Sequence, residues 1–94
     1  MATHTVTLTW TASLDAVDGY NVYRSTNAPG SEKAPAQNSA LITGTTYTDT
    51  VPAPGVYDYV VTSVENGAES VHSSEVVATV LPFPPSNIVV SAVN

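Results

Sequence analysis

The two histidines are the most versatile side chains of the sequence, and their spacing is a first test for a reactive site. His4 and His72 lie far apart and form neither a His-x-His nor a His-x-x-x-His pair. A metal site would require them to converge with acids from distant loops, so surface or edge positions are expected instead. Asp15 and Asp18, in LDAVDG, lack the alternating oxygen ligands of a calcium loop. Turn formation explains these two acids better.

Patterns for nucleophilic or phosphate chemistry are also absent from the sequence. No serine lies in a Gly-x-Ser-x-Gly elbow, no acid is paired with a histidine at a recognisable spacing, and no glycine-rich phosphate loop is present. Arg24 is expected to be a solvated strand residue. The sequence therefore predicts that the protein is not an enzyme and has no catalytic, cofactor-binding or metal-binding residue, and it leaves any ligand-binding residue open.

The composition restricts the partners further. The chain of 94 residues has a net charge of −6, with only Arg24 and Lys33 as basic residues, and it has no cysteine. Such an acidic surface disfavours nucleic acid and anionic membrane surfaces. No apolar run approaches the roughly 20 residues of a membrane span, and the N-terminus lacks the basic and apolar regions of a signal peptide. Without disulfides, the core must hold by packing alone.

The elements that would position any site are strands, because the dominant periodicity is two. Apolar and polar residues alternate in HTVTLTWTAS, YNVYRS, TTYTDTV, VYDYVVTSV and SSEVVATV, and no segment keeps helical spacing for more than a turn. Polar and glycine-rich stretches separate these runs, including a loop over residues 26–38 and the turn ENG. Short strands divided by turns predict an all-β antiparallel sandwich.

The strand sequences resemble a known family. VTLTW, VDGYNVYRS, TTYTDTVPAPGVYDYVVTSV and SSEVVATVLP are similar to strands B, C, E, F and G of a fibronectin type III domain, with ALI in the place of strand C′. The sequences of these strands are most similar to repeats found in extracellular bacterial proteins. The resemblance implies an immunoglobulin-like sandwich of two antiparallel sheets over residues 1–81, in a secreted or cell-surface protein.

Two aromatic positions carry the most specific part of this resemblance. VPAPGVYDYVV is similar to the family's corner between strands E and F, which implies that the hydroxyl of Tyr57 bonds upstream backbone. Trp10 lies on the strand before that of Tyr20, as in fibronectin type III domains. Trp10, Tyr20, Tyr57 and Tyr59 are therefore expected to form the core.

One departure concerns the strand that normally opens the family's fold. Val6 already lies in strand B, so strand A is missing from the N-terminus, and the C-terminal PFPPSNIVVSAV resembles it. Residues 82–94 are thus interpreted as a proline hinge with a strand-A-like tail. The tail is the start of a following repeat, folds back beside the last strand, or fills a strand A slot. We expect it to be ordered as a strand, with exchange between molecules favoured over local fold-back.

The predicted function is that of a non-catalytic spacer or protein-interaction module. Its expected partners are neighbouring domains or identical copies, bound through the C-terminal strand. The alternative is a carbohydrate-binding accessory module of a secreted polysaccharide-degrading enzyme. For that role, Tyr23, expected to face outward, and Phe83, in the hinge, are the aromatic candidates.

Overall fold

The computed structural model describes residues 3–26, 30, 36–86 and 88–93, and this part of the chain contains strands and no helix. The strands are β1 (His4–Thr9), β2 (Gly19–Thr26), β3 (Thr46–Val51), β4 (Gly55–Glu65), β5 (Ala68–Glu69) and β6 (Val76–Val80). The alternating segments of the sequence thus form the strands that their period of two predicts.

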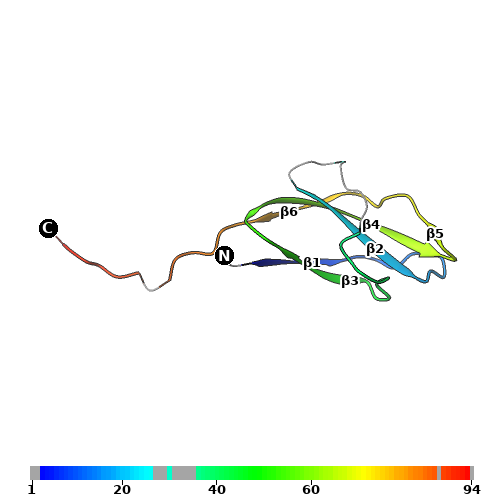
Figure 1. Cartoon of the computed structure of the whole chain (residues 1–94), viewed down its shortest axis with the longest axis horizontal. Helices are drawn as coiled ribbons and strands as arrows, with labels where there is room; N and C mark the ends of the chain where they lie inside the picture. Colours follow the sequence, from blue (N-terminus) through cyan, green and yellow to red (C-terminus); the bar gives the residue numbers. More distant parts are fainter. Residues whose placement is uncertain (1–2, 27–29, 31–35, 87, 94) are drawn as a thin grey trace.

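The strands form two antiparallel sheets that face each other (Figure 1). In the smaller sheet β1 pairs with β3, and Leu8 lies opposite Tyr47. In the larger sheet β4 is central: β2 pairs with one edge, while β5 and β6 pair with different parts of the other. This arrangement confirms the predicted two-sheet sandwich.

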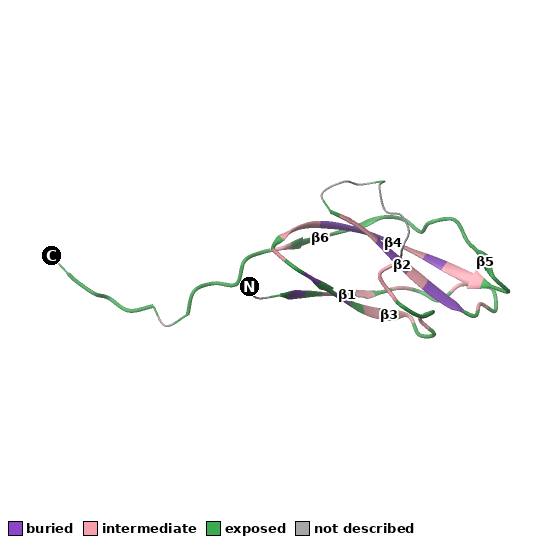
Figure 2. Cartoon of the chain, viewed as in Figure 1, coloured by how far each residue is buried: buried purple, intermediate pink, exposed green. Residues whose placement is uncertain are grey.

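Aromatic and β-branched side chains fill the space between the sheets. The central cluster consists of Val22, Val51, Tyr57 and Tyr59. The partly buried Val6 and Leu8 of β1, and Trp10 just after it, pack against this cluster. The indole ring of Trp10 meets the ring of Tyr20 edge-on, with centroids 5.4 Å apart. Figure 2 shows the buried stretches within the facing strands. The predicted aromatic core is therefore confirmed.

Local turn chemistry explains the tight reversal between β4 and β5. Asn66 and Gly67 both have positive φ angles, 51° and 81°. Asparagine and glycine tolerate this region best, and the turn was predicted from ENG. Where the sequence predicts a strand C′ at ALI, the structure has a single antiparallel bridge between Tyr20 and Ile42. The predicted loop over residues 26–38 lies largely outside the described residues.

The C-terminal tail leaves the body as an extended arm. Residues 82–86 and 88–93 carry no strand and are exposed, and the molecule measures 69 × 24 × 21 Å along its principal axes. The arm points away from the pole at which β6 ends (Figure 1). The tail therefore differs from the expected strand, because a strand requires a partner edge and the outward course of the arm places it beside no strand of its own body.

Candidate functional site: an open side of the sandwich

One edge of β1 has no partner strand within the part of the chain that the structure describes. The N–H of Trp10 donates to the Thr45 carbonyl at 2.9 Å, on the β3 side. Because backbone groups alternate along an antiparallel ladder, the N–H and C=O groups of Thr5, Thr7 and Thr9 point to the opposite side. These three residues are exposed, so β1 presents a free row of donors and acceptors.

The segment between β5 and β6 faces the free edge of β1 across the open side of the sandwich. Here serine hydroxyls replace part of the ladder to β4: Ser70 Oγ and Ser73 Oγ accept hydrogen bonds from the N–H groups of Ser63 and Val61, both at 2.9 Å. The N–H groups of the same two serines donate to the Ser63 and Val61 carbonyls. Residues 70–75 are consequently held beside β4 without forming a strand.

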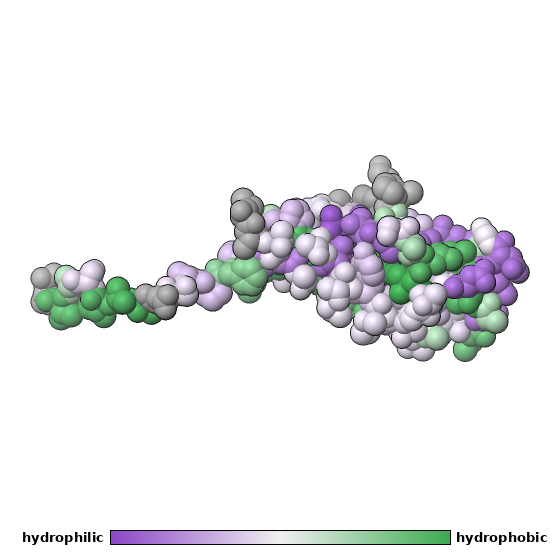
Figure 3. Space-filling view, turned by 60° about the horizontal axis from the view of Figure 1, so that its bottom comes forward, coloured by the Kyte–Doolittle hydropathy of each residue, from purple (hydrophilic) through white to green (hydrophobic). Residues whose placement is uncertain are grey.

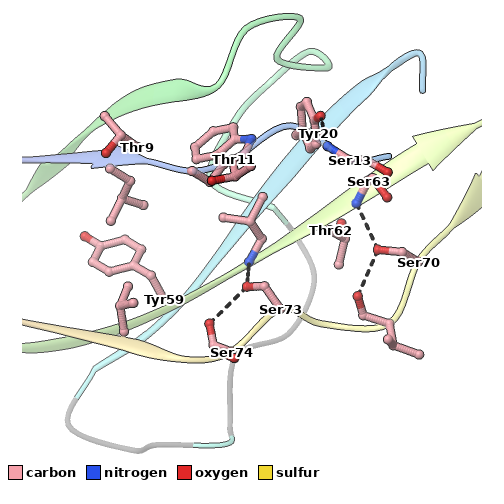
Figure 4. Close-up of a pocket in the computed structure, with 15 residues that line it drawn as sticks. Thr9, Thr11, Ser13, Tyr20, Tyr59, Thr62, Ser63, Ser70, Ser73 and Ser74 are labelled. Carbon is pink, nitrogen blue, oxygen red and sulfur yellow. Dashed lines mark hydrogen bonds between the residues drawn. The ribbon is translucent and has the colours of Figure 1, made fainter. Parts of the chain in front are cut away.

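Between these two edges lies a pocket of about 570 Å³. Figure 4 shows Thr9 and Thr11 on one side, Ser73 and Ser74 on the other, and Tyr59 and Thr62 between them. The lining is apolar or hydroxyl-bearing and carries no charged side chain; it consists of Leu8, Thr9, Trp10, Thr11, Ser13, Tyr20, Tyr59, Val61, Thr62, Ser63, Ser70, Val71, Ser73, Ser74 and Val76. Such a surface suits an uncharged apolar segment.

The indole N–H of Trp10 is a buried donor in the wall of this pocket. It has no hydrogen-bond acceptor among the described residues, whereas buried donors in native proteins are nearly always bonded. The open side of the sandwich therefore contains a buried donor whose hydrogen bond is not made by the described residues.

The histidines and the loop acids do not converge on a common site. No group of three or more metal-ligating side chains occurs in the described part of the chain. Asp18 accepts a hydrogen bond from the N–H of Asn66 at 2.8 Å, which agrees with its predicted role in turns. Asp15 is exposed, and its N–H donates to the Ser13 hydroxyl at 3.2 Å.

His4 and Phe83 join the start of β1 to the proline hinge. Their rings stack with centroids 4.1 Å apart and an interplanar angle of 16°. His4 is buried, while Phe83 remains 61% exposed. The stack places the start of the hinge beside the start of β1.

Tyr23 lies on the outer face of its sheet, as expected. The expectation that its side chain is exposed to solvent is wrong. Only 8% of Tyr23 is accessible, and its ring lies against His72 with centroids 5.6 Å apart. Its hydroxyl donates to Glu69, which also accepts from the Thr62 hydroxyl. Tyr23 is therefore covered by residues from the other side of β4, and its ring does not offer an open platform for a sugar.

The expectation for Arg24 is likewise corrected. Its guanidinium donates to Asp49 Oδ2 at 2.8 Å, and the Tyr59 hydroxyl donates to the same oxygen at 2.8 Å. The Arg24 side chain is 20% exposed and that of Asp49 only 6%. Arg24 is thus one member of a largely buried network that joins β2, β3 and β4, rather than a solvated strand residue.

Three tyrosines have raised pKa values: Tyr59 and Tyr23 in these networks, and Tyr47, whose hydroxyl donates to the Gln37 carbonyl. Burial, followed by the hydrogen bond to Asp49, raises the pKa of Tyr59 far above its usual range. The hydrogen bond to Glu69, followed by burial, raises the pKa of Tyr23. Burial, followed by the charge of Asp49, raises the pKa of Tyr47. The folded state therefore favours the neutral phenols.

A loss of stability at alkaline pH follows from these shifts. The contribution of each phenol is complete below the unfolded pKa of about 10 and is lost as pH rises through the higher folded value. Each group can lower the unfolding free energy by at most about 1.4 kcal/mol per pH unit. Urea midpoints should therefore fall between pH 9 and pH 11.5, and less steeply in Tyr59→Phe. A midpoint that stays constant over this range would contradict the assignment.

Comparison with solved structures identifies the architecture. The chain matches a Fn3-like protein from Clostridium thermocellum at 36% sequence identity and a TM-score of 0.68, over 86% of this chain and 81% of that chain. The chain belongs to the fibronectin type III-like family. No protein-family model and no curated protein matches the sequence.

Within the fibronectin type III-like fold, the candidate site is where the family's strand A would pair. The sequence resemblance assigns β1 to strand B and β6 to strand G, and the free edge of β1 and the pocket lie between them. The predicted corner is present: the hydroxyl of Tyr57 donates to the Ala53 carbonyl at 2.5 Å. The vacant slot was expected from the sequence, but its wall of Ser70, Ser73 and Ser74 was not.

Proposed function

We propose that this fibronectin type III-like chain is a non-catalytic spacer or protein-interaction module. It would associate with neighbouring domains or identical copies through its C-terminal strand. The observation that carries the proposal is the coexistence of a free strand edge on β1 and an exposed apolar arm. Both features expose groups that are normally covered in a folded domain.

The arm supports this role through its composition. Ile88, Val89, Val90 and Val93 are each more than three-quarters exposed, and residues 82–94 include no charged side chain. Figure 3 shows the arm as a largely apolar extension of a body with many hydrophilic residues. Such a segment gains most from a site that removes it from water.

The chemistry of the pocket supports a non-catalytic role. Its lining lacks acids, histidines and basic residues, which are the usual groups for proton transfer.

No helix in the described ranges is long and apolar enough to cross a membrane. A secreted or surface-exposed bacterial protein is the setting that we propose, from the sequence resemblance and from the Clostridium neighbour.

The carbohydrate-binding alternative remains a prediction without a supporting observation. Its two aromatic candidates are engaged elsewhere, with Tyr23 covered and Phe83 stacked on His4.

Light scattering across a concentration series tests the proposed association. We expect the apparent mass of the intact chain to rise with concentration. It should rise further with added salt, which screens repulsion between copies of net charge −6. A triple variant, Ile88→Ser with Val89→Ser and Val90→Ser, keeps the charge and should remain monomeric. An intact chain that stays monomeric at every concentration would overturn the proposal.

A further inference from the structure

We infer that the arm of one copy adds as a strand to β1 of a second copy, entering the pocket between β1 and residues 70–76. The arm would run antiparallel to β1, with Ile88 and Val90 facing the pocket. This inference rests on the proposed function and specifies its partner, its acceptor surface and its direction. Repetition of the contact joins copies head to tail.

The backbone chemistry of the two surfaces is complementary. The outward-facing groups of Thr5, Thr7 and Thr9 have the spacing that an added antiparallel strand requires. The described residues of the arm form no ladder in the single chain. Strand addition satisfies both sets of backbone groups at once.

The lengths of donor and acceptor also agree. Residues 88–93 span about 20 Å as a strand, and β1, with six residues, spans about the same length. The uncharged pocket lining suits the uncharged arm. Both copies are acidic, and contact through neutral surfaces avoids bringing their like charges close together.

The side-chain pattern selects the face of the arm that enters the sandwich. Ile88, Val90 and Ala92 alternate with Val89, Ser91 and Val93, so the two faces are distinct. The β1 side chains of Val6 and Leu8, followed by Trp10, point inward to the core. Directly opposed residues share a face, and the entirely apolar Ile88 face therefore matches this inner row.

The geometry favours a second copy over the arm's own pocket. The arm leaves at the pole where β6 ends and His4 begins β1, and it points outward along the long axis (Figure 1). The pocket is lined by the opposite end of β1 and the residues that follow it, from Leu8 to Thr11. Residues 81–86 reach only about 19 Å as polyproline. A copy stacked on this pole would instead receive the arm along its outward course.

A pair of complementary variants tests this assignment in the full-length chain. Val90→Asp places a charge on the inward face of the donor, and Val76→Asp places one in the acceptor pocket, where Val76 is 52% exposed. Each variant alone should weaken self-association by at least about tenfold, because a buried carboxylate would be unpaired. Ser74→Asp is a second pocket variant at an exposed position, in case Val76→Asp impairs folding.

Two matched controls add the same charge away from the proposed contact. Val89→Asp alters the outward face of the arm, and Thr79→Asp alters an exposed position of β6 that does not line the pocket. Both should change self-association by less than about threefold. If Val89→Asp disrupts association and Val90→Asp does not, the assigned face is wrong and the inference fails as stated.

Mixing the two disruptive variants provides the decisive measurement. The Val76→Asp chain retains an intact arm, and the Val90→Asp chain retains an intact pocket. Their mixture should form a one-to-one dimer that does not grow, because the remaining arm and the remaining pocket are both blocked. Analytical ultracentrifugation distinguishes this dimer from monomers and from longer oligomers.

The outcomes separate this inference from the proposed function. If Val90→Asp abolishes association but both pocket variants associate normally, the arm acts on another surface, and only the inference is overturned. If the mixture remains monomeric although both chains are folded, the inference is also overturned. Concentration-independent burial of the arm within one chain would instead show local fold-back and would contradict the exchange.

Discussion

Replacement of Asp49 by alanine is expected to lower the unfolding free energy by about 3 kcal/mol, towards the low end for a broken buried ion pair. Asp49 Oδ2 accepts hydrogen bonds from both Arg24 and Tyr59. The substitution leaves the largely buried Arg24 guanidinium without its carboxylate partner and the hydroxyl of the fully buried Tyr59 without its acceptor. For a domain of this size, the melting temperature should fall by about 12–24 °C.

Urea denaturation at low protein concentration measures this effect, with Asp15→Ala as the matched control. Asp15 is exposed, and its loss removes the same charge without breaking a buried network. The control should change the unfolding free energy by about 0.5 kcal/mol or less. If the two alanine variants had similar stabilities, the network would not contribute as described.

Replacement of Tyr57 by alanine is expected to lower the unfolding free energy by about 3–5 kcal/mol, as for other large aromatic truncations in cores. The Tyr57 ring is 3% exposed and belongs to the central cluster. The Arg24 guanidinium lies 5.4 Å from its centroid. The substitution removes this packing and the hydrogen bond to Ala53 together.

Tyr57→Phe separates the ring from the hydroxyl at this corner. It retains the packing and removes only the hydrogen bond, so a loss of about 1 kcal/mol is expected. Urea unfolding of the two variants gives both values in one experiment. A phenylalanine variant as unstable as the alanine variant would show that packing of the ring is not the dominant contribution.

The strands and the core face could be predicted from the sequence because their signals are local. Val6, Leu8 and Trp10 alternate with threonines, and this alternation alone places them on one face. The corner of Tyr57 was also predictable, since its partner Ala53 lies only four residues upstream. The composition of the tail likewise indicated an apolar segment, but the strand expected there is not formed in the single chain.

The networks around Tyr23 and Arg24 could not be predicted in the same way. The alternation along a strand predicts the face on which a side chain lies. It does not predict which distant segment covers that side chain. Glu69 reaches Tyr23 from beyond β4, and Asp49 reaches Arg24 from another sheet. An acid on the inward face of a strand, such as Asp49 between Tyr47 and Val51, was the available signal, because a buried acid requires a partner.

By itself the sequence determined an all-β sandwich and its aromatic core, since these depend on alternation and composition along the chain. Only the tertiary structure decided that Ser70, Ser73 and Ser74 form the wall facing β1, and that the arm points outward without forming a strand. Such features depend on the positions of segments far apart in sequence. Those positions are fixed by the packing of the two sheets rather than by any local pattern.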